Sequence, residues 1–275
     1  MPSIDVSNTT LHYTDSGPRD APAVLLSHSL FFDHTMFDAQ VEHLSGTYRV
    51  VAYDHRGQGG SAPAPRDELD MDTLTADAVG LIEALGLRDV TVVGNSMGGF
   101  IALRLAARHP ELVRSAVVAG SSADVEEQIE AFAPLVEALA TDGVAPLLDP
   151  VSHIMLGDTS LSDPSRADLL RHVQDDLRGR GPSIADAAHQ VVFRDGILDE
   201  LGSITCPVLV LAGTEDHAYP PPKSRQIAEG VPDATLEVVE AAGHSVCLER
   251  PDVVNALIDA HLASLPAAAA RDAAV

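Results

Sequence analysis

Residues 94–98 read Gly-Asn-Ser-Met-Gly and place one serine between two glycines. An apolar, β-branched run at 90–95 leads into this segment, and a helical pattern follows Ser96 directly. Glycine costs about 1 kcal/mol relative to alanine inside a helix or strand, so this spacing needs a reason. A G-x-S-x-G turn between strand and helix holds the serine in a strained conformation that only small neighbours tolerate, and it pushes the hydroxyl outward. Ser96 is therefore predicted to be a nucleophile; the alternative is a glycine-rich turn whose serine only caps the helix.

A serine hydroxyl is a weak nucleophile until a base removes its proton, and that base needs a third group to orient it. His244 follows the predicted strand that ends at Glu240, so its loop lies at the carboxyl edge of the sheet, as Ser96 does. Two features favour His244 over the other histidines: it follows a predicted strand directly, and it comes after the serine and the candidate acids in the chain. Four of those are interpreted as solvated surface residues: His12, His43, His109 and His172.

The orienting acid is expected between the serine and the histidine in the chain. Asp216 comes just after the apolar run at 208–213, one strand before the candidate base. Two other carboxyl groups are alternatives. Glu215 is adjacent but is expected to point elsewhere in the turn, and Asp124 follows the run at 115–120.

Attack on a carbonyl creates an oxyanion, which needs preorganised hydrogen-bond donors. The backbone N–H of Met97, the first residue after the nucleophile, is one candidate. The second is expected from the loop after the first buried strand, with Leu30 as the candidate and Ser29 as the alternative. Phe31 and Phe32 follow in the same loop and are expected either to line the entrance to the site or to pack in the core.

Strand and helix patterns alternate along the chain and position these residues. The apolar runs are short, which is typical of strands buried on both faces of a parallel sheet. Helical patterns occupy 71–85, closed by Gly86, and 251–265, which begins with a proline. The pattern predicts an α/β protein with a mostly parallel sheet, whose ligands bind at the carboxyl ends of the strands. The predicted strands are 24–28, 50–54, 90–95, 115–120, 208–213 and 235–240.

The alternation stops between residues 121 and 200, where helical patterns occur without a convincing strand. This segment is predicted to be a helical cap inserted after the sixth strand, over the carboxyl edge of the sheet; ordinary crossover helices are the alternative. One helical face is predicted from Val125, Ile129, Phe132, Val136 and Leu139, and a second helix from residues 166–177. The predicted units are a core of 1–120 and 201–265, the cap, and a flexible tail at 266–275.

The composition excludes several classes of protein. A formal net charge of −24 makes nucleic acids and anionic membrane surfaces poor partners, because binding phosphate requires clustered lysine and arginine. No apolar run reaches the roughly 18 residues of a membrane span. Cys206 and Cys247 are expected to be reduced thiols, and the start of the chain does not resemble a signal peptide, so a cytoplasmic protein is expected.

Five segments together resemble the α/β-hydrolase superfamily: LLSHSLFFD, VVAYDHRGQGGS, VVGNSMGGFIAL, VLAGTEDHAYPPP and AAGHSVCLERP. The chain is most similar to the enol-lactonase, carboxylesterase and perhydrolase group, which also has a helical cap. The resemblance implies Ser96 as nucleophile, His244 as base and Asp216 as orienting acid. One departure concerns the oxyanion loop, where the usual His-Gly is His28-Ser29 here.

The predicted function is hydrolysis of a small, neutral carboxylic ester or lactone through an acyl-enzyme, with no metal and no organic cofactor. The acidic cap favours neutral over dianionic substrates. A carbon–carbon hydrolase of aromatic ring cleavage is an alternative, although the chain has no tryptophan after the histidine. A receptor-like hydrolase that binds its ligand with little turnover is the other alternative. Haloalkane dehalogenases and epoxide hydrolases carry aspartate at the nucleophile position, and Ser96 excludes both.

Overall fold

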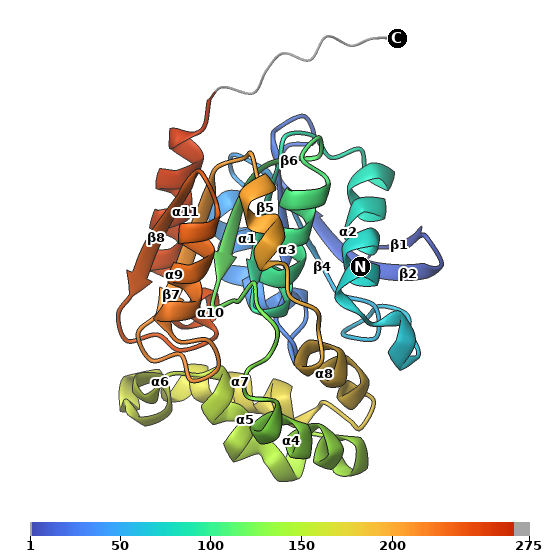
Figure 1. Ribbon diagram of the computed structural model, residues 1–275, viewed down its shortest axis with the longest axis vertical. Coiled ribbons are helices and arrows are strands. Elements are labelled where there is room, and N and C mark those ends of the chain that lie inside the picture. The colour runs from blue at the N-terminus through green and yellow to red at the C-terminus, as the bar shows by residue number, and fades with distance from the viewer. Residues whose placement is uncertain (1, 267–275) are drawn as a thin grey trace.

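The computed structural model describes residues 2–266, which fold around an eight-stranded sheet (Figure 1). The strand order is β1-β2-β4-β3-β5-β6-β7-β8. β2 pairs antiparallel with β1 and β4, and the other neighbouring strands are parallel. This mostly parallel sheet confirms the predicted fold class. The strands are β1 (Ser3–Val6), β2 (Thr9–Ser16), β3 (Ala23–Ser27), β4 (Arg49–Tyr53), β5 (Val90–Asn95), β6 (Val113–Ala119), β7 (Val208–Gly213) and β8 (Ala234–Val239).

The central strands form the core of the sheet. Every residue of β3, β4, β5 and β7 is buried, as expected for apolar strands covered on both faces. All six predicted strands are present, with their ends displaced by no more than two residues. The antiparallel strands β1 and β2 were not predicted, because most of their residues are only half-buried or exposed and form no continuous apolar run.

Helices cover both sides of the sheet (Figure 1). α2 (Met71–Ala84) packs against α3 (Met97–Arg108), and α1 (Asp38–Leu44) packs against α11 (Pro251–Ser264). The predicted helices at 71–85 and 251–265 are confirmed. Asp70 precedes α2 as its N-cap, and its carboxylate accepts the N–H groups of Asp72 and Thr73 in the first turn of the helix. α9 (Pro221–Gly230) packs against β7 and β8, and the short α10 (Val246–Glu249) precedes α11.

Five helices lie between β6 and β7 and gather at one end of the sheet (Figure 1). They are α4 (Ile129–Asp142), α5 (Leu148–Met155), α6 (Asp158–Ser162), α7 (Ala167–Arg178) and α8 (Ile184–Val192). The helical insertion after the sixth strand is therefore confirmed. The exact division into core and cap remains a prediction, and all of the predicted tail except Pro266 lies outside the described residues.

The first predicted helix of the insertion is partly wrong. Val125 lies before α4 and is 48% exposed, and Ile129, the first residue of the helix, is 37% exposed. Val136 and Leu139 are buried as expected, and Phe132 is partly buried against the core. The apolar residues at the start of this pattern therefore do not belong to one buried face.

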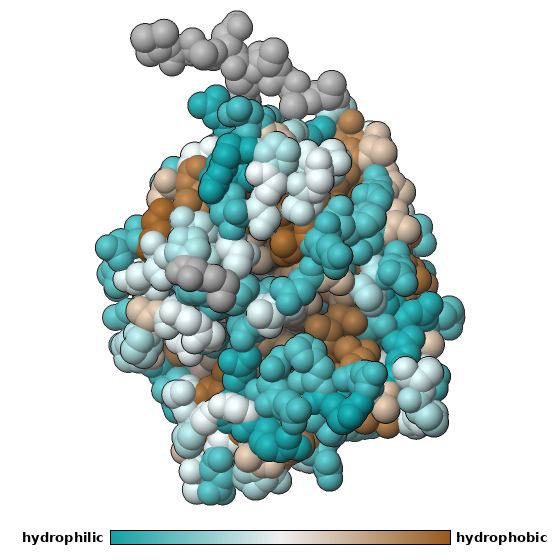
Figure 2. Space-filling model, turned by 180° about the vertical axis from the view of Figure 1, so that it is seen from behind, coloured by the Kyte–Doolittle hydropathy of each residue, from teal (hydrophilic) through white to brown (hydrophobic). Residues whose placement is uncertain are grey.

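The surface is hydrophilic over much of the face seen in Figure 2. Figure 2 shows a face on which hydrophilic residues cover most of the area and small hydrophobic areas lie between them. Cys206 and Cys247 are buried and free, and burial raises the pKa of their thiols to about 11 and about 12 respectively. Among residues 2–266, no helix combines the length and the apolar character needed to cross a membrane.

Candidate active site

Ser96 lies at a strained turn between β5 and α3. Its backbone has φ 54° and ψ −114°, and its N–H donates to the carbonyl of Ala119 on β6 at 2.9 Å. The flanking glycines are required by close backbone contacts. A Cβ at Gly94 would lie 2.1 Å from the carbonyl oxygen of Gly98, and a Cβ at Gly98 would lie 1.8 Å from that of Ser27 on β3. The Ser96 side chain does not cap α3, so its hydroxyl is free to face another group.

That group is His244. The Nε2 atom of its imidazole lies 2.7 Å from Ser96 Oγ, and its Nδ1 atom lies 3.1 Å from each carboxylate oxygen of Asp216. All three side chains are buried, although they come from the ends of β5, β7 and β8. The structure thus brings together the three residues that the sequence singled out.

The carboxylate of Asp216 is fixed by its own loop. The N–H groups of Ala218 and Tyr219 donate to its Oδ1 at 2.9 and 2.8 Å. An ionised carboxylate only accepts hydrogen bonds, so His244 presents Nδ1–H to Asp216 and an unprotonated Nε2 to the Ser96 hydroxyl. This tautomer is the one that can receive a proton from the serine.

The two alternative acids lie elsewhere. The Glu215 carboxylate accepts the N–H and the hydroxyl of Thr159 on α6, both at 2.7 Å, and so joins the core to the inserted helices. Asp124 accepts the N–H of Val125 at 2.8 Å, and its other oxygen lies 3.9 Å from the Lys223 ammonium. In residues 2–266, neither carboxylate contacts His244.

The loop that carries His244 is held from two sides. The Asn95 side chain donates from Nδ2 to the His244 carbonyl at 3.0 Å. Glu249, buried on α10, accepts the N–H of Gly243 and the N–H of Gly157, each at 2.9 Å. Burial raises the pKa of the Glu249 carboxyl. Sequence reasoning missed Glu249, because nothing in its local pattern indicates a bond to a residue near α6.

The proposed oxyanion donors, Leu30 and Met97, are buried at this site. Within residues 2–266, neither N–H has an acceptor, which is unusual for a buried amide and leaves both free for a ligand. The next residue, Phe31, has a φ of 74°, a conformation that is rare outside glycine. Arg180, between α7 and α8, donates from Nε to the Phe31 carbonyl at 2.7 Å and from Nη2 to Asp33 at 2.9 Å, and so fixes the loop.

His28 supports the same loop from within the core. The His55 N–H donates to His28 Nε2 at 3.1 Å, so the ring proton is on Nδ1, which donates to the Ser29 carbonyl at 2.8 Å. Burial lowers the pKa of both imidazoles and keeps them neutral. The Ser29 hydroxyl is buried without a partner in the described part of the chain. His28-Ser29 therefore shapes the loop in place of the usual His-Gly.

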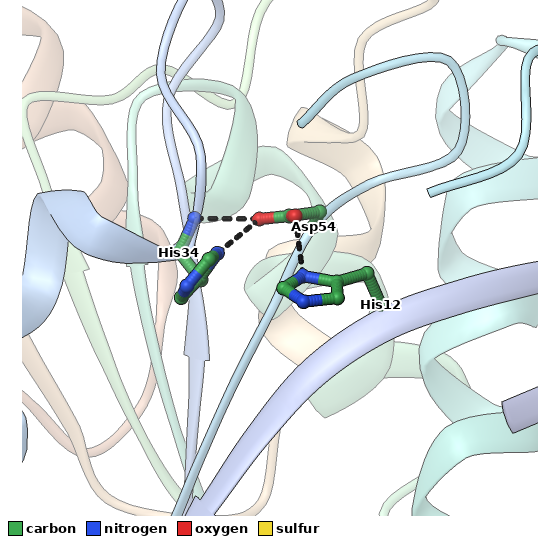
Figure 3. Close-up of side chains that lie close together, drawn as sticks. All are labelled: His12, His34 and Asp54. Atoms are coloured by element: carbon green, nitrogen blue, oxygen red, sulfur yellow. Dashed lines mark hydrogen bonds and ion pairs between the residues drawn. The ribbon is translucent and has the colours of Figure 1, made fainter. Parts of the chain in front are cut away.

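A second cluster anchors the far end of this loop. Figure 3 shows His12 and His34 on either side of Asp54, with each Nδ1 atom 2.8 Å from a different carboxylate oxygen. The N–H groups of His34 and Gly60 also donate to Asp54, both at 2.7 Å. Burial opposes ionisation of Asp54, but the hydrogen bonds from His34 and Gly60 outweigh it and hold the pKa of this carboxyl well below its usual range.

The expectation that His12 is a solvated surface residue is wrong, because its side chain is only 14% exposed and pairs with Asp54. His12, His34 and Asp54 are all types of residue that bind metals, and their ligand atoms lie within 4.8 Å of one another. All four acceptor positions of the carboxylate are already used, however, so the cluster fits a structural clamp. The side chains of the predicted surface histidines His43 and His172 are 40% and 61% exposed, and each lies beside an aspartate.

A cavity that is partly open to solvent lies beside Ser96. Leu30, Phe31 and His244 line it, together with residues of α4, α5 and α8. Phe31 thus has the position expected for a pocket residue, whereas Phe32 is buried outside the lining. Most of the lining is apolar, which suits the organic part of a small substrate.

The sequence matches the α/β hydrolase fold family over residues 22–251. The chain belongs to the α/β-hydrolase fold family. It is accordingly a hydrolase that acts on a small molecule, and the arrangement of Ser96, His244 and Asp216 lies within the matched region.

Two curated relatives match the hydrolase over most of its length. The putative carbamate hydrolase RutD of Caulobacter sp. (strain K31) is 32% identical over 250 residues, covering 90% of this chain and 93% of that protein. The 3-oxoadipate enol-lactonase 2 of Acinetobacter baylyi is 27% identical over 259 residues, covering 94% and 95%. These similarities agree with the resemblance to the enol-lactonase and esterase group.

Solved structures are similar to this chain over almost its whole length. The enol-lactonase from Burkholderia xenovorans LB400 has a TM-score of 0.86 and 29% identity, with 95% of this chain and 100% of that chain covered. A thermophilic esterase from Thermogutta terrifontis has a TM-score of 0.87 and 24% identity, covering 96% and 98%, and shows the shared fold.

Proposed function

We propose that the hydrolase cleaves small, neutral carboxylic esters or lactones through an acyl-enzyme formed on Ser96. The observation that carries this proposal is the 2.7 Å contact between Ser96 Oγ and His244 Nε2, on an imidazole whose Nδ1 faces Asp216. A hydroxyl, a base and an orienting acid in this sequence of contacts are what nucleophilic attack by serine requires.

In the first step, Ser96 Oγ attacks the carbonyl carbon while His244 Nε2 takes the hydroxyl proton. Asp216 holds the imidazole in the productive tautomer and stabilises the imidazolium that forms. The N–H groups of Leu30 and Met97 donate to the oxyanion, and such a donor typically contributes a factor of about 10²–10³ to turnover. His244 then gives its proton to the leaving oxygen, the bond between carbonyl carbon and that oxygen breaks, and the acyl group stays on Ser96.

The second step repeats these roles with water. His244 Nε2 takes a proton from water as the water oxygen attacks the acyl carbon, and the same two amides stabilise the second oxyanion. The proton then returns to Ser96 Oγ as the acyl–oxygen bond breaks and the acid leaves. No residue outside the described site is needed to balance protons in either step.

The cavity and the charge of the chain support the substrate class. The lining is mostly apolar, which favours an uncharged organic group. The net charge of −24 disfavours dianionic substrates. Relatives named as enol-lactonases support lactones beside open-chain esters.

The test is multiple turnover of p-nitrophenyl acetate by the purified protein. We expect steady release of p-nitrophenol beyond one equivalent, and loss of this release in Ser96→Ala. Labelling of Ser96 by a fluorophosphonate without turnover would instead support a binding protein and contradict the proposal. Hydrolysis of a carbon–carbon bond in a vinylogous 1,5-diketone, in the absence of any esterase activity, would support the alternative hydrolase.

A further inference from the structure

The cavity beside Ser96 contains one acidic side chain among apolar ones. Glu126, in the segment between β6 and α4, lines the cavity together with Ser96 and His244, and it is 5% exposed. Apart from these three and Tyr219, the lining consists of leucine, isoleucine, valine, alanine, methionine and phenylalanine. A carboxylate in such surroundings is expensive to desolvate, so its position calls for an explanation.

The hydrogen bonds of Glu126 leave one acceptor position unused. The Tyr219 hydroxyl donates to Oε2 at 2.9 Å, and Arg194 Nη1 donates to the same oxygen at 3.3 Å. The Gln128 N–H donates to Oε1 at 2.9 Å. A carboxylate has about four acceptor positions, so Oε1 can accept one more hydrogen bond.

Arg194 balances the charge of Glu126 without lining the cavity. Its guanidinium is buried 4.2 Å from the centre of the Phe100 ring and also donates to the Val191 carbonyl at 2.8 Å. Its Nη2 atom has no partner among the described residues. The charged group that a substrate meets in the cavity is therefore the carboxylate and not the guanidinium.

Tyr219 connects this carboxylate to the candidate catalytic residues. Its ring lies edge-on to the His244 ring with the centroids 5.3 Å apart, and its N–H donates to Asp216. Burial raises the pKa of Tyr219, which keeps its hydroxyl protonated as the donor to Glu126. Because Tyr219 contacts both Glu126 and the candidate catalytic residues, a substitution at Glu126 can lower turnover of every substrate. Only the ratio of activities on different substrates therefore shows whether Glu126 recognises a substrate group.

We propose that Glu126 determines the substrate class of this site. It accepts a hydrogen bond from a hydroxyl or amide N–H on the substrate group that occupies the cavity, and it disfavours a substrate that places a carboxylate there. A hydrogen bond to a buried charged group is stronger than one between neutral groups. Arg194 offsets the charge of Glu126 but does not line the cavity, so a substrate carboxylate there would meet the acceptor oxygens of Glu126 and an apolar lining, with no cation to offset its desolvation. This inference rests on the proposed ester hydrolysis at Ser96 and refines it.

The test compares three ethyl esters that differ at the far end of the acyl chain: ethyl pentanoate, ethyl 4-hydroxybutyrate and monoethyl succinate. Three acetates with the same end groups on the alcohol side cover the opposite orientation. Hydrolysis is followed by pH-stat titration in the wild type, Glu126→Gln, Tyr219→Phe and Glu127→Gln. Glu127 is the matched control, because it is the next residue, is 60% exposed and pairs with Lys223 at 2.6 Å. Its substitution removes the same charge outside the cavity.

In at least one series, the wild type should have a kcat/KM about a hundredfold lower for the carboxylate-ended ester than for the methyl-ended one. Glu126→Gln should narrow this gap by roughly tenfold and reduce the advantage of the hydroxyl-ended ester, while Glu127→Gln leaves both ratios unchanged. Tyr219→Phe keeps the carboxylate and should keep the discrimination against the carboxylate-ended ester.

Three results would overturn the inference. Ser96-dependent turnover with the same ratios in the wild type and Glu126→Gln would refute the role of Glu126 and leave the proposed function standing. An equal shift of the ratios in Glu127→Gln would assign the discrimination to the overall charge. Absence of Ser96-dependent turnover on all six esters would refute the proposed function together with the inference.

Discussion

Replacing Asp216 by asparagine should reverse the proton arrangement of His244. The N–H groups of Ala218 and Tyr219 both donate to Oδ1, at 2.9 and 2.8 Å. In Asp216→Asn the amide oxygen keeps this position, because the amide nitrogen would meet two donors there. Nδ2 then takes the place of Oδ2, 3.1 Å from His244 Nδ1, while the amide oxygen at the Oδ1 position already accepts two backbone N–H groups at the same distance from the ring. An imidazole N–H and an amide N–H cannot face each other at this distance, so Nδ1 loses its proton and accepts a hydrogen bond from Nδ2. The imidazole proton moves to Nε2, which faces Ser96 Oγ and can no longer accept its proton.

The wrong tautomer in an otherwise intact triad costs on the order of 10⁴ in kcat, or about 5 kcal/mol in the barrier. We expect this loss in kcat for p-nitrophenyl acetate, with an unchanged melting temperature, because the two backbone bonds to residue 216 remain. Labelling of Ser96 by a fluorophosphonate should slow in parallel.

Asp124→Asn is the matched control, since Asp124 contacts Val125 and Lys223 and not the imidazole. It should keep the wild-type kcat. A loss of less than about tenfold in Asp216→Asn would refute the assignment of the orienting acid. A large loss in Asp124→Asn would refute it as well.

Three further predictions concern the supports of the site. Gly98→Ala puts a Cβ 1.8 Å from a carbonyl oxygen of β3, so it should lower the free energy of unfolding, measured by urea titration, by roughly 2–4 kcal/mol. Gly46→Ala is the control: nothing lies within 4 Å of the added Cβ, so the free energy of unfolding should stay close to that of the wild type. Arg180→Met removes the hydrogen bonds that hold the loop carrying Leu30, so it should lower kcat about tenfold or more with little change in KM. A rise in KM with an unchanged kcat would contradict the role of Arg180 in positioning this loop. The hydrogen bond to Asp54 raises the pKa of His34, so this pair stabilises the fold at pH 5–6 and its contribution declines as the pH rises through the raised pKa. His34→Gln should therefore lower the free energy of unfolding more at about pH 5.5 than at about pH 8.5. An equal loss at both pH values would contradict the pairing.

The sequence predicted the parallel part of the sheet and the three candidate catalytic residues because both depend on local patterns. The carboxyl ends of β5, β7 and β8 share one edge, so residues just beyond these strands had to lie near one another. The elbow glycines also had a local cause, in the backbone contacts of Gly94 and Gly98.

The features that sequence reasoning missed depend on contacts between distant segments. Glu249 bonds to Gly157 and Arg180 to Phe31, and neither pair has a spacing that indicates contact. The surface assignment of His12 failed because its partner, Asp54, is 42 residues away. β1 and β2, the first two strands at one end of the sheet, were missed because most of their residues are only partly buried and form no continuous apolar run.

Mass-spectrometric analysis of the fluorophosphonate-treated protein tests most directly whether one activated serine carries out the chemistry. We predict one phosphonyl group per chain, located on Ser96, and a loss of esterase activity in proportion to the labelled fraction. Full labelling with activity retained, or a phosphonyl group on another residue as activity is lost, would contradict the account.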